Sequence, residues 1–166
     1  MPLSIEQINR FTQGEFTEAV GWVFEHSPWV AERAWHHRPF ASCGQLSERM
    51  NGEVAAASPE EHLALLRAHP DLGTRAKISP NSTTEQAGAG LDRLTSEEHK
   101  RLLDLNNAYR EKFGFPFLYA VKGADKFAIL EALERRLGSN RADEFQEAFG
   151  HVYRIARFRL ESIMNE

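Results

Sequence analysis

The sequence lacks the features that mark secreted, membrane-bound and disulfide-stabilised proteins. Its 166 residues include one cysteine, Cys43, so an intramolecular disulfide is excluded. No stretch approaches the ~20 apolar residues that a transmembrane helix needs, and the N-terminus lacks a basic segment followed by an apolar one. These absences predict a cytoplasmic protein with no membrane partner.

An excess of positive charge is also missing. The chain has 20 Lys and Arg against 24 Asp and Glu, a formal net charge of −4, so its overall field does not attract the phosphates of a nucleic acid. Its 11 glycines and 7 prolines are too few for a low-complexity chain. Hydrophobic residues make up 42%, enough for a continuous core. We therefore predict one globular domain over residues 1–166 and no nucleic-acid partner.

Strand patterns are nearly absent, whereas signals for helix starts recur. They occur at Ser27-Pro28, at Ser58-Pro59-Glu60-Glu61 and at Thr95-Ser96-Glu97-Glu98. Apolar periodicity predicts further helices at about 14–26, 42–57, 125–137 and 141–163. The run from Phe115 to Val121 has no second strand to pair with, so we interpret it as a buried connector. The pattern predicts an all-α, single-domain helical bundle of about seven to nine helices.

Two candidate functional positions flank the long irregular stretch from Asp71 to Ser82. His69 precedes Pro70, which disfavours helical dihedrals in the residue before it, so His69 is predicted to end a helix. A histidine held there suits proton transfer near neutral pH. Beyond the stretch, Ser82-x-x-Glu85 is typical of a capping box, which predicts a helix start at Ser82. Glu85 and Gln86 in its first turn either cap the helix or face a pocket.

The last predicted helix carries an arginine on its apolar face. At about 100° per residue from Phe145, the apolar positions fall within about 60°, and Arg159 falls among them at about −40°. Arg154 and Arg157 point away from that face. Two interpretations stay open: Arg159 snorkels or pairs with a structural carboxylate, or its guanidinium fork awaits an anionic ligand.

Several motifs, in order along the chain, resemble the signatures of one family. They are His69-Pro70-Asp71-Leu72-Gly73; Ser82, Glu85-Gln86 and Ala89-Gly90-Leu91; Asn107, Tyr109 and Lys112 to Phe117; Phe24-Glu25, Ser27-Pro28-Trp29 and Arg38-Pro39-Phe40; and Arg154 to Leu160. Together they are similar to 2-oxo-4-hydroxy-4-carboxy-5-ureidoimidazoline (OHCU) decarboxylases over nearly the whole chain.

The resemblance implies an all-helical, usually dimeric enzyme of urate catabolism that needs no cofactor. Such an enzyme releases carbon dioxide from OHCU and forms (S)-allantoin. By motif position, the resemblance implies catalytic roles for His69, Glu85 and Arg159. It implies that Pro70, Ser82 and Gln86 line the pocket, and that the backbone of Phe117, Leu118 and Tyr119 binds ring carbonyls.

Two further points concern mechanism and partners. The residues leave open whether His69 first deprotonates the substrate hydroxyl or only protonates the carbon; an initial contact to the hydroxyl or carboxylate, followed by proton delivery, is our preferred order. The sequence does not contain the Tyr-Arg-Gly-Ser ending of the transthyretin-like hydroxyisourate hydrolase that precedes this step. We therefore expect a stand-alone decarboxylase with a separate hydrolase upstream.

Two other function classes compete with this interpretation. A metal-dependent helical hydrolase could use some of the seven histidines, but none of the spacings we tested, including those of His62, His69 and the His36-His37 pair, matches a metal motif, so we predict no metal site. In a helical interaction module with no enzymatic activity, the same motifs would serve only to cap helices and to supply small residues. It predicts an exposed apolar surface and no convergent polar pocket.

Overall fold

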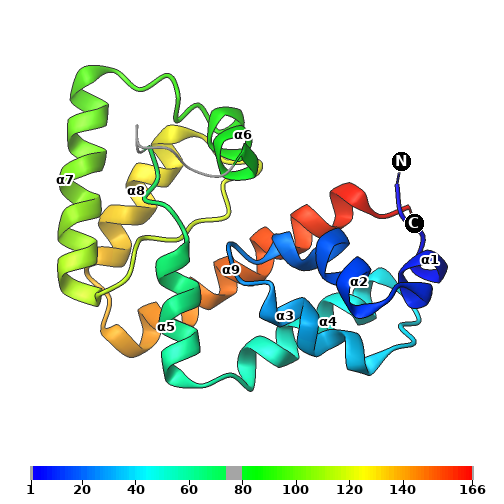
Figure 1. Cartoon of the computed structure of the whole chain (residues 1–166). Helices are drawn as coiled ribbons and strands as arrows, with labels where there is room; N and C mark the ends of the chain where they lie inside the picture. Colours follow the sequence, from blue (N-terminus) through cyan, green and yellow to red (C-terminus); the bar gives the residue numbers. More distant parts are fainter. Residues whose placement is uncertain (1, 74–79, 166) are drawn as a thin grey trace. The chain divides into compact units, whose positions relative to one another are not determined.

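The computed structural model describes residues 2–73 and 80–165, and within these ranges helices joined by loops make up the fold (Figure 1). The described residues form nine α-helices and two short 3-10 helices, and Leu3 and Met164 form an isolated parallel bridge. The all-α prediction is confirmed, with the number of α-helices at the upper end of the predicted range. None of the described helices combines the length and the apolar character that crossing a membrane requires.

The contacts divide the chain into two compact units, residues 1–68 with 153–166 and residues 69–152. The first unit contains α1 (Ile5–Arg10), α2 (Gln13–Val20), α3 (Trp29–Ala34), α4 (Cys43–Ala55) and α5 (Pro59–Ala68). The second unit contains α6 (Pro80–Gly88), α7 (Ser96–Phe113) and α8 (Lys126–Leu137). The last helix, α9 (Arg141–Ile163), gives its first half to the second unit and its last half to the first.

In the first unit, α3 packs against both α2 and α4. Phe16 and Phe40 stack in the core of this unit with their ring centroids 5.8 Å apart. The predicted start of α5 is confirmed, because the Ser58 hydroxyl accepts from the Glu61 N–H at 3.1 Å and the Glu61 carboxylate accepts from the Ser58 N–H at 3.1 Å. This capping box satisfies two backbone donors that a helix start leaves unpaired.

In the second unit, α7 packs along α8 (Figure 1). Thr95 caps the start of α7, and Gly114 ends it with φ at 82°, a left-handed conformation that glycine adopts without steric cost. Residues 115–121 form neither helix nor strand, and most of their side chains are buried. The predicted buried connector is therefore confirmed.

Three local predictions need correction. Helix α6 begins at Pro80 rather than Ser82, because proline lacks the N–H that a first helical residue leaves unpaired and its fixed φ suits that position. The helix expected at 14–26 ends at Val20, and a 3-10 turn follows over Gly21–Val23. The short α1, with its Ser4 cap, was not predicted.

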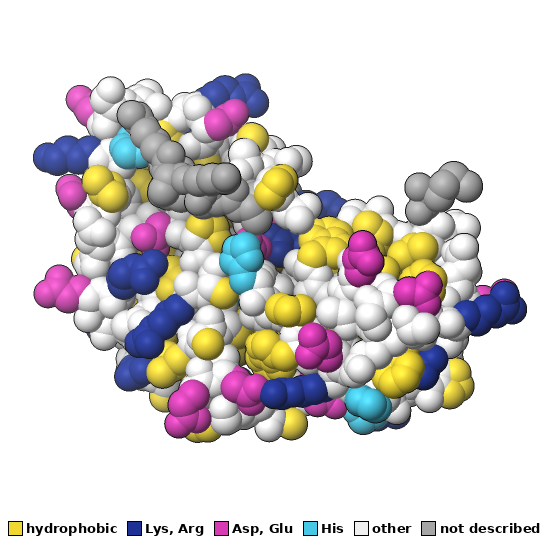
Figure 2. All heavy atoms as spheres, viewed as in Figure 1, with side chains coloured by type: hydrophobic (Ala, Val, Ile, Leu, Met, Phe, Trp, Pro, Cys, Tyr) yellow, Lys and Arg dark blue, Asp and Glu magenta, His cyan; other side chains and the backbone are white. Residues whose placement is uncertain are grey.

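Acidic and basic side chains are interspersed on the face shown in Figure 2, with hydrophobic side chains scattered between them. This mixture matches the nearly balanced charge of the sequence. The surface in this view therefore gives no sign of a polyanion-binding face.

Candidate active site

His69 directly follows the last helical residue of α5, Ala68, as the sequence predicted. The following Pro70 disfavours another helical residue, so the chain leaves the helix axis at the histidine. Only 6% of His69 is exposed. An imidazole held at a helix end and largely shielded from solvent is suited to directed proton transfer.

Three side chains of the second unit hold the backbone after His69 and Pro70. Arg110 Nη2 lies 2.9 Å from Asp71 Oδ1, Asn106 Nδ2 donates to the Leu72 carbonyl at 3.0 Å, and the Gly73 N–H donates to Gln86 Oε1 at 2.8 Å. Two of these side chains come from α7 and one from α6. The segment after the histidine is therefore fixed by side chains far away in the sequence.

Gly73 is the position in this segment that requires glycine. Its φ is +72°, and a Cβ there would lie 2.3 Å from Leu102 Cδ2. Any other residue would combine a left-handed backbone with a severe steric clash. The close approach of this turn to α7 thus depends on the missing side chain.

Helix α6 carries Ser82, Glu85 and Gln86 on one side, since residues three and four apart lie on the same face of a helix. Ser82 and Gln86 are buried, and Glu85 is half-buried. Ser82 is the third residue of this helix, so it is not the first-turn cap that the sequence predicted. Residues 74–79 of the stretch between Asp71 and Ser82 lie outside the described residues.

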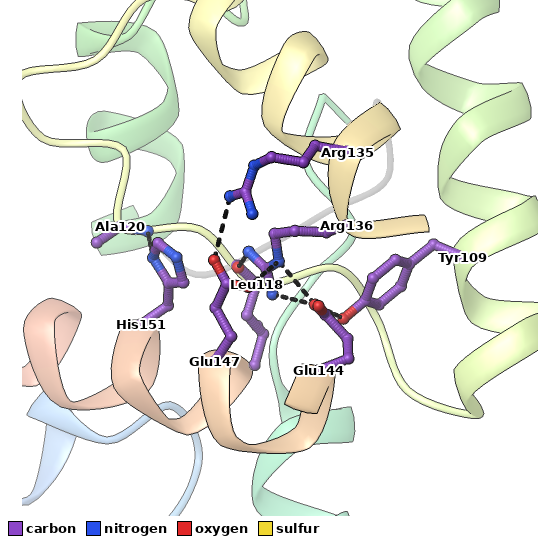
Figure 3. Close-up of polar contacts among 8 residues, drawn as sticks. All are labelled: Tyr109, Leu118, Ala120, Arg135, Arg136, Glu144, Glu147 and His151. Carbon is purple, nitrogen blue, oxygen red and sulfur yellow. Dashed lines mark hydrogen bonds and ion pairs between the residues drawn. The ribbon is translucent and has the colours of Figure 1, made fainter. Parts of the chain in front are cut away.

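The connector segment Phe117-Leu118-Tyr119 lies against α8 and α9 of the second unit (Figure 3). Phe117 and Tyr119 stack with centroids 6.0 Å apart and rings inclined by 21°. The Leu118 carbonyl accepts from Arg136 Nη1 at 2.6 Å. The backbone that is predicted to bind the substrate is thus hydrogen-bonded to the buried Arg136 side chain.

Arg136 and Glu144 form a buried ion pair behind this segment. Arg136 Nε lies 2.7 Å from Glu144 Oε1, and neither side chain is exposed to solvent. The Tyr109 hydroxyl donates to the same carboxylate oxygen (Figure 3). Burial, together with the adjacent carboxylate, raises the pKa of Tyr109 well above its usual range. Tyr109 is therefore a neutral hydrogen-bond donor.

His151 on α9 contacts the other end of the segment. The Ala120 N–H donates to His151 Nδ1 at 2.9 Å, and the imidazole stacks on Tyr119 with centroids 4.8 Å apart. A backbone N–H can only donate, so Nδ1 carries a lone pair in this arrangement and the ring proton of the neutral imidazole is on Nε2. This bond exists only while Nδ1 is unprotonated.

Arg159 belongs to the first unit, where it is 4% exposed. Its Nη1 lies 2.8 Å from Glu25 Oε2, and Glu25 is 3% exposed. The same nitrogen lies 3.5 Å from the carbonyl oxygens of Trp22 and Val23. The predicted inward orientation is confirmed, and so is the pairing with a carboxylate that the sequence left open.

The turn after the 3-10 helix Gly21–Val23 presents Glu25 to Arg159. The Ser27 hydroxyl donates to the Glu25 carbonyl at 2.9 Å, and the Ser27 N–H donates to the Phe24 carbonyl at 3.1 Å. His26 has φ at +48°, a left-handed conformation that costs about 1–2 kcal/mol for a residue with a side chain. The turn therefore holds Glu25 in place although His26 adopts an unfavourable backbone conformation.

The sequence reasoning missed four site residues, and one of them has a signal. Arg136 lies seven residues after the buried Ile129, so it falls about 20° from it on the apolar stripe of α8. The test that singled out Arg159 would have found Arg136. Glu144 and His151 fall at about −100° and −120° from Phe145, outside the apolar stripe of α9, so periodicity does not single them out. Glu25 has no periodic signal, because it lies in a turn.

A model of the OHCU decarboxylase family matches residues 9–161. The chain belongs to the OHCU decarboxylase family. A 2-oxo-4-hydroxy-4-carboxy-5-ureidoimidazoline decarboxylase of Halalkalicoccus jeotgali is 45% identical over 97% of this chain and 92% of its own length. One of Haloferax volcanii is 46% identical over 95% of this chain and 94% of its own length.

Longer proteins also contain a segment like this OHCU decarboxylase family member. The uric acid degradation bifunctional protein PucL of Bacillus subtilis is 45% identical over 98% of this chain, which spans 33% of that protein. Among solved structures, a crystal structure of (S)-allantoin synthase has a TM-score of 0.81 and 31% identity, over 98% of this chain and 54% of that chain.

Acidic, histidine and cysteine side chains do not gather into a possible metal site in the part of the chain that the structure describes. No group of three or more of them is placed to hold an ion there. The prediction that the histidines hold no metal stays a prediction for the whole protein.

Proposed function

We propose that this protein catalyses the decarboxylation of 2-oxo-4-hydroxy-4-carboxy-5-ureidoimidazoline to (S)-allantoin, as a carboxy-lyase of urate catabolism. The observation that carries the proposal is the similarity to named decarboxylases along nearly the full length of both chains, 97% of this chain and 92% of the Halalkalicoccus jeotgali protein. The fixed His69 turn and the buried Arg159 supply the side-chain chemistry that such a reaction requires.

The reaction breaks the bond between the ring carbon and the carboxylate. Carbon dioxide leaves without the bonding electron pair, which is delocalised into the adjacent C=N and carbonyl groups of the ring. The hydroxyl on that carbon then loses its proton and becomes a carbonyl, and a proton added to one face of the neighbouring carbon, which carries the ureido group, gives a single enantiomer. The substrate is its own electron sink, so we propose that no cofactor takes part. The enzyme must stabilise the developing charge and deliver one proton.

We assign His69 to the proton. In our preferred order it first contacts the substrate hydroxyl or carboxylate and then protonates the ring carbon. Glu85, half-buried on α6, accepts from ring or ureido N–H groups. Arg159 stabilises negative charge on the substrate, and its pairing with Glu25 fixes the plane of the guanidinium.

Six further residues are proposed to bind the substrate. Ser82 and Gln86 share the side of α6 that carries Glu85, and Pro70 follows the histidine. Backbone N–H groups of the Phe117-Leu118-Tyr119 segment donate to ring carbonyls. Gln86 Oε1 accepts from the Gly73 N–H, so this residue also links the pocket side of α6 to the turn after His69.

The test is decarboxylation of freshly generated OHCU, followed by circular dichroism of the allantoin formed. We expect His69→Asn to lose about 10²–10⁴-fold in kcat, the usual contribution of a general acid or base. His36→Asn is the matched control, because His36 is exposed in the first unit. A His69→Asn protein that forms (S)-allantoin at the wild-type rate would refute the catalytic role.

Arg159 is tested against a neighbour on the same helix. Arg159→Lys keeps a cation opposite Glu25 but removes the planar fork, so we expect a higher KM or lower kcat in a folded protein. Arg154→Lys is the control, since Arg154 is exposed. Wild-type kinetics in folded Arg159→Lys would reduce Arg159 to a structural partner of Glu25.

The cellular setting is part of the same proposal. We propose that residues 1–166 act as one domain, in agreement with a family match that extends over both compact units. We further propose a cytoplasmic homodimer that receives its substrate from a separate hydroxyisourate hydrolase. Size-exclusion chromatography with light scattering tests the dimer, and a monomeric active enzyme would contradict it.

A further inference from the structure

The two peptide groups on either side of Tyr119 are each bonded to a buried side chain of the second unit. The Leu118 carbonyl accepts from Arg136 at 2.6 Å, and the Ala120 N–H donates to His151 at 2.9 Å (Figure 3). Arg136 is 0% exposed and His151 is 5% exposed. One bond comes from α8 and the other from α9.

These two bonds determine the backbone conformation of Tyr119. A peptide group is planar, and in the trans form its C=O and N–H point in opposite directions. The bond to the Leu118 carbonyl therefore directs the Tyr119 N–H away from Arg136. The bond from the Ala120 N–H likewise directs the Tyr119 carbonyl away from His151. With both planes set, neither φ nor ψ of Tyr119 can rotate freely.

The surroundings make each anchor rigid. Glu144, which accepts from Tyr109, holds the Arg136 guanidinium, and this group also lies 4.5 Å from the centre of the Phe117 ring. The His151 imidazole stacks on the Tyr119 ring itself, inclined by 25°. Backbone and side chain of the same residue are thus immobilised by one histidine. Such preorganisation saves the entropy that a flexible segment would lose on binding.

We infer that Arg136 and His151 are positioning residues that aim the Tyr119 N–H at a carbonyl of the substrate ring. The inference rests on the proposed function, in which the backbone of residues 117–119 binds the ring. Neither side chain needs to touch the substrate, because each acts through a peptide plane. The ligand class at this point is a cyclic amide or ureide carbonyl, which accepts one hydrogen bond from the backbone.

The decisive variants separate the hydrogen bond from the stacking. His151→Phe keeps an aromatic ring against Tyr119 but removes the acceptor, whereas His151→Asn places an acceptor near the Nδ1 position without the ring. We expect His151→Phe to raise KM for OHCU about tenfold with a smaller change in kcat, since a ground-state contact is lost. We expect His151→Asn to restore KM to within about threefold of wild type.

Arg136→Lys tests the other anchor. A lysine keeps the charge opposite Glu144, but its single ammonium cannot reproduce the fork that reaches both the carboxylate and the Leu118 carbonyl. A raised KM in this variant supports the inference. His99→Phe, at a half-buried histidine on α7, is the matched control and should leave KM unchanged. Wild-type KM in either folded variant, His151→Phe or Arg136→Lys, overturns the inference.

Two measurements on the free protein keep this inference separate from the proposed function. In wild-type protein, ¹⁵N NMR should show His151 Nδ1 unprotonated, and the Ala120 amide should exchange slowly with solvent. In His151→Phe that amide should exchange faster, while in His151→Asn it stays protected. A protonated Nδ1 in wild type overturns the inference whether or not His151→Phe folds. If the anchors behave as expected and OHCU is not decarboxylated, the proposed function fails and the anchoring stands.

Discussion

Arg136 Nε lies 2.7 Å from Glu144 Oε1, and both side chains have no solvent exposure. Burying two charges costs several kcal/mol each, and their mutual attraction offsets this only when the geometry is good. Here the arginine also bonds the Leu118 carbonyl, and the carboxylate also accepts from Tyr109. The pair therefore links α8, α9, α7 and the connector of the second unit. It contributes more to the relative positions of these segments than to the net free energy of folding.

Removing one member of this pair should be far more damaging than removing all of it. We expect Arg136→Met to lower the free energy of unfolding by about 3–5 kcal/mol, because Glu144 would be buried without a counter-charge. The triple variant Y109F/R136M/E144L removes all three polar side chains and should recover part of that loss, although the Leu118 carbonyl still loses its donor. Urea unfolding measures both. An equal loss in the two proteins would contradict the desolvation argument.

Tyr109 should make stability fall at alkaline pH. Its pKa in the folded protein is raised, mainly by burial, whereas in the unfolded chain it is about 10. The stabilisation is therefore complete below about pH 10 and is lost as the pH rises above the unfolded value. Over that range wild type should lose up to about 1.4 kcal/mol per pH unit more than Tyr109→Phe. Urea midpoints of the two proteins between about pH 9 and 11 give the difference. Parallel curves would show that Tyr109 does not contribute.

Glu25 should be needed to keep Arg159 inside the first unit. Glu25→Leu leaves a 4% exposed guanidinium without its carboxylate, so we expect a loss of about 3–5 kcal/mol in the free energy of unfolding. Glu25→Gln should lose less, because its amide oxygen still accepts a hydrogen bond. Chemical denaturation compares the two variants. A Glu25→Leu protein as stable as wild type would show that Arg159 finds other compensation.

Gly73 offers a test of the turn that follows His69. Gly73→Ala combines a left-handed φ with a Cβ 2.3 Å from Leu102, and we expect it to lose about 2–4 kcal/mol of stability. Gly52→Ala in α4 is the contrasting control. A Cβ at Gly52 meets no atom within 4 Å, so alanine should add up to about 1 kcal/mol through helix propensity. Thermal unfolding distinguishes the two, and equal effects would contradict the clash.

The local structure could be predicted where neighbouring residues decide it. The Ser58 and Thr95 caps and the histidine before Pro70 all depend on residues within one helical turn, and all are confirmed. The predicted start of α6 was wrong because Pro80 and Ser82 are both acceptable first-turn residues, and local preference does not choose between them. The burial of Arg159 could be predicted because, at about 100° per residue, the spacing of residues in the sequence tells which face of a helix each side chain is on.

The amino-acid sequence by itself determined the all-α class, the capped starts of α5 and α7 and which arginine of the last helix turns inward, since these follow from contacts between near neighbours. Only the tertiary structure decided what those side chains meet: Glu25 for Arg159, Gln86 for the Gly73 backbone, and Arg136 and His151 for the peptide groups beside Tyr119. These partners lie 13 to 134 residues apart in the chain, the gap of 134 being that between Glu25 and Arg159. Periodicity states that a side chain is buried, but the partner that offsets its desolvation is chosen by packing between distant segments.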